Sequence, residues 1–232
     1  VFLEFTTAFA SLSPAQFAKQ VLCDGIGTRE LFVGEHFAFG KGRAGRIADL
    51  LELGAQLGFR VHPTPPVMID GEVVSSTRIR QMIQAGDLQK AIRFLGRPYG
   101  IEGQVIPGAH RGTELGWPTA NLRLPEGRVI PPDGVYAARV LWNRRALDSV
   151  VYIGTRPTFG AGERLLEVSI LDERLELYGE TIRVELLGFV REDRVFASAE
   201  ALTRQIELDV DAARTQLRET AVDKVSPLHS QL

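Results

Sequence analysis

The chain has 232 residues, of which 44% are hydrophobic and 24% charged, and a formal net charge of −2. This composition is typical of a packed globular protein long enough for two compact units, and the acidic balance argues against a nucleic-acid partner. No run of about 18 apolar residues is present, which argues against a membrane partner. The chain start lacks the pattern of a secretory signal, and the single cysteine excludes a disulfide framework. We therefore predict a cytoplasmic protein.

The first part of the chain, residues 1–95, alternates helical and extended patterns. Ser13 followed by Pro14 is typical of a helix start, because proline at the first helical position loses no hydrogen bond. The other predicted elements are a strand in which the chain opens, a short strand at RELFVG, a helix at GRIADLLELGAQLGF, a short strand near Arg60 to His62, and helices at TRIRQMIQAG and DLQKAIRFLG. The alternation indicates an α/β domain. Because the chain opens with Val1 inside a predicted strand, we expect that an N-terminal portion is missing.

The pattern changes from Arg97 onward, where short runs rich in Val, Ile, Tyr and Thr are separated by glycine and proline. GVYAARVLW, SVVYIG, LLEVSIL and TIRVELLGFV are such runs, and they predict an antiparallel barrel or sandwich. A helical pattern returns near Ser198 and is followed by a tail. We place the domains at residues 1–95 and 96–220, with a flexible tail over 221–232, and the fold class is α+β overall.

The stretch RGTELGWPTANL combines glycines with a proline and two oxygen-bearing side chains. Gly108, Gly112 and Gly116 allow tight turns and bring backbone N–H groups close to phosphate oxygens without obstruction by side chains. This favours a nucleotide ligand.

The end of the same stretch predicts a metal site. If Pro118 to Leu122 is extended, Thr119 and Asn121 project from one face. Magnesium prefers hard oxygen ligands and is often bound together with the phosphates of a substrate. The alternative is an edge strand in which Thr119 and Asn121 face water.

A phosphoryl-transfer enzyme needs a group that orients the attacking hydroxyl and accepts its proton, and a carboxylate is the usual choice. RLLEVSIL supplies one: in a strand, Leu166, Val168 and Ile170 would fill the core while Glu167 lies on the other face. A glutamate that simply faces solvent is the alternative.

Residues 96 to about 219 resemble the riboflavin kinase module of bacterial bifunctional riboflavin kinase/FAD synthetases. The motifs that carry the resemblance are GRPYGIEGQVIPGAHRGTELGWPTANL, GVYAARV, IGTRPTFG, LLEVSILD and LYGETIRVELLGFVRED. The resemblance implies a six-stranded antiparallel β-barrel with a C-terminal helix. It also implies transfer of phosphate from MgATP to the ribityl 5′-hydroxyl of riboflavin, giving FMN.

The resemblance also assigns site residues. The Pro-Thr-Ala-Asn motif implies that Thr119 and Asn121 hold Mg²⁺ with the nucleotide, and the E-V-x-x-L-D context implies that Glu167 is catalytic. Arg191 would lie on the flavin side of the site. Tyr152 departs from the family, which more usually has asparagine there. The nucleotide-binding residues implied by the glycine-rich flap and the motif are Gly108, Arg111, Gly112, Leu115, Gly116, Pro118, Thr119 and Asn121.

Residues 1–95 resemble the later part of the FMN adenylyltransferase domain of the same family, which is a Rossmann-like α/β nucleotidyltransferase. VVSSTRIRQMIQAGD carries the resemblance and implies a phosphate-binding element made by Ser75, Ser76, Thr77 and Arg80. The alternative is a helix cap with surface arginines. The family's opening strand and H-x-G-H loop have no counterpart in this sequence, so we expect no FAD synthesis by the chain as it stands.

Two other functions remain open from the sequence. A non-catalytic flavin or nucleotide sensor would keep the pocket without turnover, and a nucleic-acid-binding barrel is suggested by the excess of arginine over lysine. The acidic net charge argues against the second. The partners expected are small molecules (riboflavin, FMN, ATP and ADP) with no nucleic acid and no membrane, and the sequence does not determine the oligomeric state.

Overall fold

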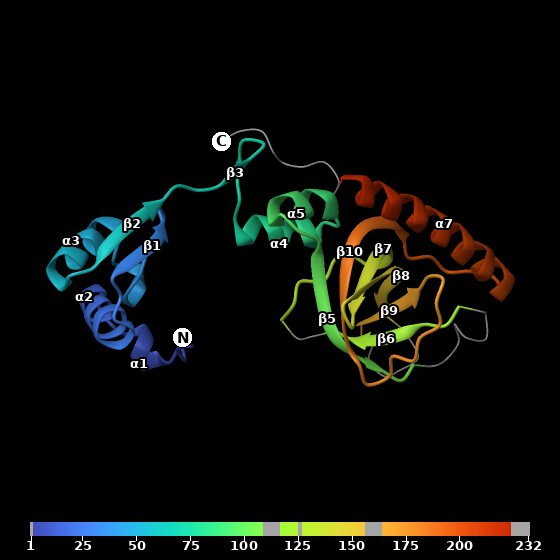
Figure 1. Ribbon diagram of the computed structural model, residues 1–232, viewed down its shortest axis with the longest axis horizontal. Helices are drawn as coiled ribbons and strands as arrows, with labels where there is room; N and C mark the ends of the chain where they lie inside the picture. The colour runs from blue at the N-terminus through green and yellow to red at the C-terminus, as the bar shows by residue number, and fades with distance from the viewer. Residues whose placement is uncertain (1, 109–116, 125–126, 156–163, 224–232) are drawn as a thin grey trace. The chain divides into compact units, whose positions relative to one another are not determined.

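The computed structural model describes residues 2–108, 117–124, 127–155 and 164–223 (Figure 1). The chain divides into two compact units, Val1–Val74 and Ser75–Leu232. Each unit has its own buried core.

The first unit is a small α/β arrangement. Strands β1 and β2 pair in parallel, from Glu30 opposite Arg60 to Gly34 opposite Thr64, and the helix α3 connects them. A core made by residues such as Leu50 lies against one side of the pair. The elements are α1 (Thr7–Ala10), α2 (Pro14–Gln16), the π-helix η1 (Phe17–Ile26), β1 (Glu30–Gly34), the 3₁₀ helix η2 (Lys41–Arg43), α3 (Ile47–Leu57), β2 (Arg60–Thr64), β3 (Met68–Ile69) and β4 (Glu72–Val73).

The predicted strand at the start of the chain is wrong. Residues 2–6 have no regular structure and lead into the short helix α1, where the Thr6 side chain accepts a hydrogen bond from the Phe9 backbone N–H at 3.1 Å. This local cap offers the backbone an alternative to strand pairing. The predicted helix start at Ser13 is confirmed, because Ser13 and Gln16 form a reciprocal capping box.

The second unit is a closed six-stranded barrel in the order β10-β5-β6-β9-β8-β7, and all its pairings are antiparallel. Register shifts between Leu186 and Gly188 and between Phe189 and Arg191 mark bulges in β10 that let this strand bend and pair on both edges. The elements are α4 (Ser76–Gln84), α5 (Leu88–Leu95), β5 (Tyr99–Ile106), β6 (Ala120–Arg123), β7 (Gly134–Trp142), β8 (Arg145–Thr155), β9 (Arg164–Ile170), β10 (Thr181–Glu192) and α7 (Ala199–Asp223).

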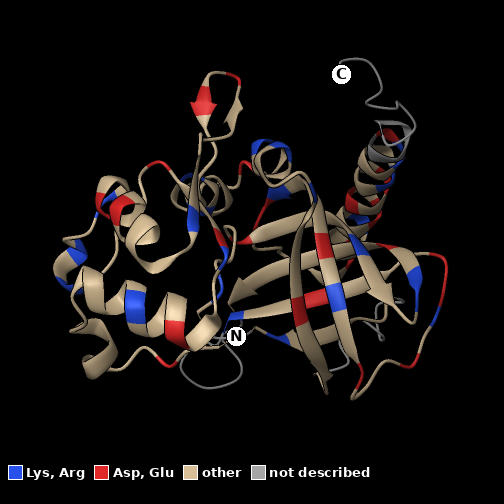
Figure 2. Ribbon diagram, turned by 60° about the vertical axis from the view of Figure 1, so that its left-hand side comes forward, with Lys and Arg blue, Asp and Glu red and all other residues tan. Residues whose placement is uncertain are grey.

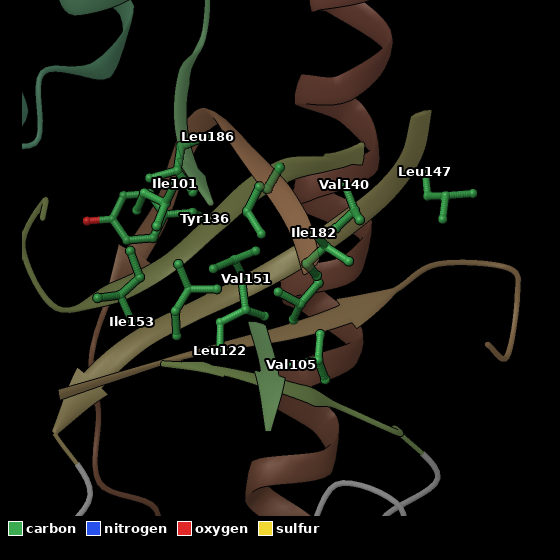
Figure 3. Close-up of a cluster of buried hydrophobic side chains, with 14 of the residues drawn as sticks. Ile101, Val105, Leu122, Tyr136, Val140, Leu147, Val151, Ile153, Ile182 and Leu186 are labelled. Atoms are coloured by element: carbon green, nitrogen blue, oxygen red, sulfur yellow. The ribbon is translucent and has the colours of Figure 1, made fainter. Parts of the chain in front are cut away.

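The barrel interior is filled by alternate residues of every strand (Figure 3). Leu122, Leu166 and Val168 belong to this core and are almost fully buried. Side chains alternate along a strand, so Asn121 and Glu167 lie on the outer face of the barrel. α7 covers another part of that face, in a second cluster whose buried members are Ala137, Leu171, Leu187, Val210, Ala213 and Leu217. The barrel and its C-terminal helix confirm the predicted fold.

Residues 75–95 group with the barrel by their contacts, although the sequence placed them in the first domain. Leu88 belongs to the barrel core, and Gln89 Nε2 donates a hydrogen bond to the Leu187 carbonyl at 2.7 Å. The predicted boundary near residue 95 stays a prediction about the family's domains.

Charges of both signs are interleaved over the barrel strands (Figure 2). Arg139 Nε, for example, lies 3.0 Å from Asp148 Oδ1 on the neighbouring strand. Within the described residues, no helix has both the length and the hydropathy needed to cross a bilayer.

We predict that Leu122→Ala lowers the free energy of unfolding of the second unit by about 3 kcal/mol, because it removes a fully buried side chain and leaves a cavity. Leu208→Ala is the matched control, since Leu208 on α7 is 62% exposed, and it should change the same quantity by less than about 0.5 kcal/mol. Urea unfolding followed by tryptophan fluorescence measures both, because Trp117 and Trp142 lie in this unit. Equal losses in the two variants would contradict the barrel core described here.

Candidate active site

Two of the predicted site residues are direct neighbours on adjacent strands of the barrel. β6 and β9 pair so that Asn121 lies opposite Glu167, and β9 and β8 pair so that Glu167 lies opposite Tyr152. Side chains at directly opposed positions have Cβ atoms roughly 5 Å apart. The row Asn121, Glu167, Tyr152 therefore forms one continuous group on the outer face.

This row continues around the whole barrel. Ile106 on β5 is opposite Asn121 on one side, and beyond Tyr152 come Val135 on β7 and Arg191 on β10. All six strands contribute one residue. The row joins the proposed catalytic carboxylate to the arginine that the sequence placed near the flavin.

Asn121 and Glu167 are buried although they face outward. Asn121 is 3% exposed and Glu167 is 9% exposed. The backbone after β5 crosses directly over Asn121, so closely that a Cβ added to Gly108 would overlap Asn121 Nδ2. Glycine at position 108 thus allows a close approach of the backbone to the Asn121 side chain, whereas its role in nucleotide binding stays a prediction.

The amide oxygen of Asn121, Oδ1, is a buried polar atom without a hydrogen-bond partner in the described part of the chain. Buried polar atoms are almost always satisfied, so an exception calls for an explanation such as an ion. An amide oxygen beside a carboxylate is a hard donor set that fits Mg²⁺. The described residues contain no cluster of three or more His, Cys, Asp or Glu side chains that could hold a metal.

Thr119 lines a cavity that Asn121 does not line. It precedes β6 in an irregular segment and lines a cavity of about 510 Å³ together with Pro118 and Ala120. The segment 173–178, which includes Leu175, Leu177 and Tyr178, also lines this cavity. Asn121 and Glu167 do not line it. The expected convergence of the Thr119 and Asn121 oxygens therefore stays a prediction.

Tyr152 is held against Glu167 and the chain that follows β10. Its ring folds over Gly154, where an added Cβ would overlap the phenol. Burial is the main cause that raises the pKa of Tyr152 to about 12, and the nearby negative charges of Asp193 and Glu167 raise it further. The phenol is therefore neutral at physiological pH.

Arg191 is bound to the C-terminal helix. Its Nε and Nη2 each donate to the Asp209 carboxylate at 2.8 Å, and its guanidinium lies over the Phe196 ring, 5.5 Å from the ring centre. The Asp209 side chain is 4% exposed and also accepts from Gln205 Nε2 at 2.9 Å. The flavin-binding role of Arg191 stays a prediction, while its visible role is to tie β10 to α7.

The remaining predicted residues divide into two groups. Ser75 caps α4 by accepting a hydrogen bond from the Arg78 backbone N–H at 3.3 Å, and Ser76, Thr77 and Arg80 are exposed on the first turns of that helix. This geometry fits the helix-cap alternative and leaves the phosphate role as a prediction. The second group is the rest of the predicted flap, which lies outside the described residues: Arg111, Gly112, Leu115 and Gly116.

Comparisons with protein families match two separate parts of the chain. A family model described as riboflavin kinase matches residues 95–217, and one described as FAD synthetase matches residues 1–78. The bifunctional riboflavin kinase/FMN adenylyltransferase of Pseudomonas fluorescens is 41% identical over 213 residues, and that of Escherichia coli K12 is 37% identical. In both cases the match covers 91% of this chain and 68% of the relative.

A solved structure has the same fold. The crystal structure of a protein described as a macrolide-efflux protein from Streptococcus pneumoniae superposes with a TM-score of 0.82 at 32% identity, covering 91% of this chain and 68% of that one. The barrel fold and the two family matches together define the class of protein: it is a riboflavin kinase module that follows a partial FAD synthetase region. The chain belongs to the bifunctional riboflavin kinase/FMN adenylyltransferase family.

Sequence reasoning missed two features of this site. The Arg191–Asp209 pair joins residues 18 positions apart in the chain, and no motif marks it. The position of Tyr152 beside Glu167 was also missed, although the departure of Tyr152 from the family motif was a usable signal.

We predict that Gly108→Ala displaces the Asn121 side chain, because the new methyl group would occupy the position of Nδ2. The side-chain amide resonances of Asn121 in a ¹H–¹⁵N NMR spectrum should shift strongly. Gly34→Ala is the matched control, since a Cβ there meets no atom within 4 Å, and it should leave those resonances in place. Unshifted resonances in Gly108→Ala would contradict the close approach.

We also predict that Arg191→Met and Asp209→Asn each lower the free energy of unfolding by about 3 kcal/mol, because each leaves half of a buried ion pair without its partner. The losses should be far from additive in the double variant. Arg214→Met removes a more exposed ion pair, between Arg214 of α7 and Asp172 after β9, and should cost much less. Urea denaturation of these four variants and the wild-type protein measures this, and an Arg191→Met loss no larger than that of Arg214→Met would refute the anchoring role.

Proposed function

We propose that this chain is a riboflavin kinase that transfers the γ-phosphate of ATP to the 5′-hydroxyl of riboflavin, giving FMN and ADP. The observation that carries the proposal is the pairing of Asn121 with Glu167, both buried, on adjacent strands. The family membership supports the same reaction.

Glu167 is the proton acceptor in this proposal. The 5′-hydroxyl oxygen forms a bond to the γ-phosphorus, the bond between that phosphorus and the bridging oxygen breaks, and ADP leaves. The hydroxyl proton passes to the Glu167 carboxylate. Because phosphoryl transfer involves little covalent chemistry by the protein, the residues act mainly by positioning the reactants and stabilising charge.

Mg²⁺ would be held by the Asn121 amide oxygen, and by the Thr119 hydroxyl if the two converge, together with nucleotide phosphates. When bound, it would neutralise the charge of the phosphate groups during transfer. The unsatisfied and buried Oδ1 of Asn121 supports this assignment.

The cavity beside Thr119 is the proposed nucleotide site. Its volume of about 510 Å³ is in the range of small-molecule pockets. Leu175, Leu177 and Tyr178 offer apolar surface for a base, while Thr119 at its edge lies two residues from Asn121. A nucleotide bound there would direct its phosphates toward the outer row.

FMN adenylyltransferase activity is not part of the proposal. The four histidines of the chain stand at positions 36, 62, 110 and 229, and none forms an H-x-G-H motif. The cytoplasmic location remains a sequence prediction.

We predict that Glu167→Gln lowers the turnover of FMN formation by roughly a hundredfold or more, because the amide cannot accept the proton. Nucleotide binding, measured by calorimetry with MgADP, should be nearly unchanged. Glu102→Gln is the matched control, since Glu102 is exposed on β5 outside the row, and it should keep full turnover. Full turnover in Glu167→Gln would remove this residue from its role.

The proposal as a whole is tested by mass spectrometry of riboflavin incubated with the protein and MgATP, scoring FMN and FAD separately. We expect FMN. Binding of riboflavin and MgADP without any FMN would instead identify a non-catalytic sensor.

A further inference from the structure

Tyr152 occupies a position in the row that the proposed mechanism leaves unused. It lies directly opposite Glu167 on the side away from Asn121. Its neighbours Val151 and Ile153 point into the barrel core, so the Tyr152 side chain lies on the outer face with the carboxylate. The inference drawn from this position rests on the proposed function.

The order of the row determines which substrate would meet Tyr152. In-line phosphoryl transfer places the donor and the acceptor on opposite sides of the transferred group. Asn121 on β6 marks the donor side, and Glu167 on β9 must lie next to the acceptor hydroxyl. Neighbouring strands are roughly 4.8 Å apart, so the rest of the acceptor extends from Glu167 toward β8, where Tyr152 stands.

The environment of Tyr152 determines which contact it offers. Its ring lies over Gly154, and the Asp193 carboxylate is near enough to raise the pKa of the phenol, as burial does more strongly. A carboxylate only accepts hydrogen bonds, so the phenol proton is best directed toward Asp193, which leaves the phenol oxygen free to act as an acceptor. The hydroxyl groups of a polyol chain are donors that match this acceptor.

We propose that Tyr152 is a specificity-determining residue that accepts a hydrogen bond from a ribityl hydroxyl of riboflavin. The contact lies next to the 5′-hydroxyl that Glu167 deprotonates. It holds the acceptor chain along the β9–β8 side of the row, and Asp193 orients the phenol for it.

The test uses the full chain and measures flavin binding directly. Tyr152→Phe removes the hydroxyl and keeps the ring, so riboflavin binding followed by flavin fluorescence, without nucleotide, should weaken about threefold to tenfold, the range of one neutral hydrogen bond. KM for riboflavin should rise by a similar factor while KM for ATP stays unchanged. Binding of lumiflavin, which carries a methyl group in place of the ribityl chain, should be the same in both proteins.

A matched control separates this contact from a general loss of structure. Tyr99→Phe removes another half-buried hydroxyl, which donates to the Val129 carbonyl at 2.7 Å outside the row, and it should leave the affinity for both flavins unchanged. Asp193→Ala is a second variant that releases the phenol and should weaken riboflavin binding without affecting lumiflavin.

Two results would overturn the inference. One is unchanged riboflavin affinity in Tyr152→Phe, and the other is an equal loss for riboflavin and lumiflavin, which would mean that the pocket itself is disturbed. Failure of the wild-type protein to form FMN would instead refute the proposed kinase activity, and the difference in binding between the two flavins would still test Tyr152.

Discussion

The register between β6 and β9 is the constraint on which the rest of the site depends. It places Leu122 opposite Leu166 inside the barrel, and the same pairing places Asn121 opposite Glu167 outside. A slip of one residue would exchange the two faces of a strand, burying a carboxylate in the apolar core and exposing leucines. The apolar core therefore fixes the position of the polar pair. The free energy that makes the barrel fold also sets the geometry of its chemistry.

Burial of the polar pair has a cost that the fold must offset. A buried amide oxygen without a partner is costly in the absence of a ligand, and Asn121 Oδ1 is such an atom within the described residues. Gly108 permits the backbone to cover Asn121, and that cover excludes water as well. A water-poor environment strengthens the interaction between a bound cation and these oxygens. Covering the site thus lowers the stability of the ligand-free protein and makes ligand binding more favourable.

Much of the second unit could be predicted from the sequence because its signals are local. Runs of β-branched residues mark β7 to β10, and Ser75 caps the helix predicted after it. The convergence of Thr119 and Asn121 could not be established by the period of two, because β6 begins only at Ala120. The Arg191–Asp209 pair depends on how α7 packs on the barrel, which no local pattern encodes. The wrong strand at the chain start shows the same limit, since apolar residues form a strand only where a partner strand is available.

The outer row also connects the site to the closure of the barrel. It ends at Arg191, on the stretch of β10 that follows its bulges, and Asp209 holds that arginine on α7. Gly134 must lie close to β10 there, because a Cβ would come within 2.5 Å of the Arg191 carbonyl oxygen. Asp193, two residues further along the same chain, carries a negative charge that raises the pKa of the Tyr152 phenol. Loss of the Arg191–Asp209 anchor would therefore free the segment that orients Tyr152, so a stabilising ion pair on the helix side and a substrate contact on the strand side act on one short segment.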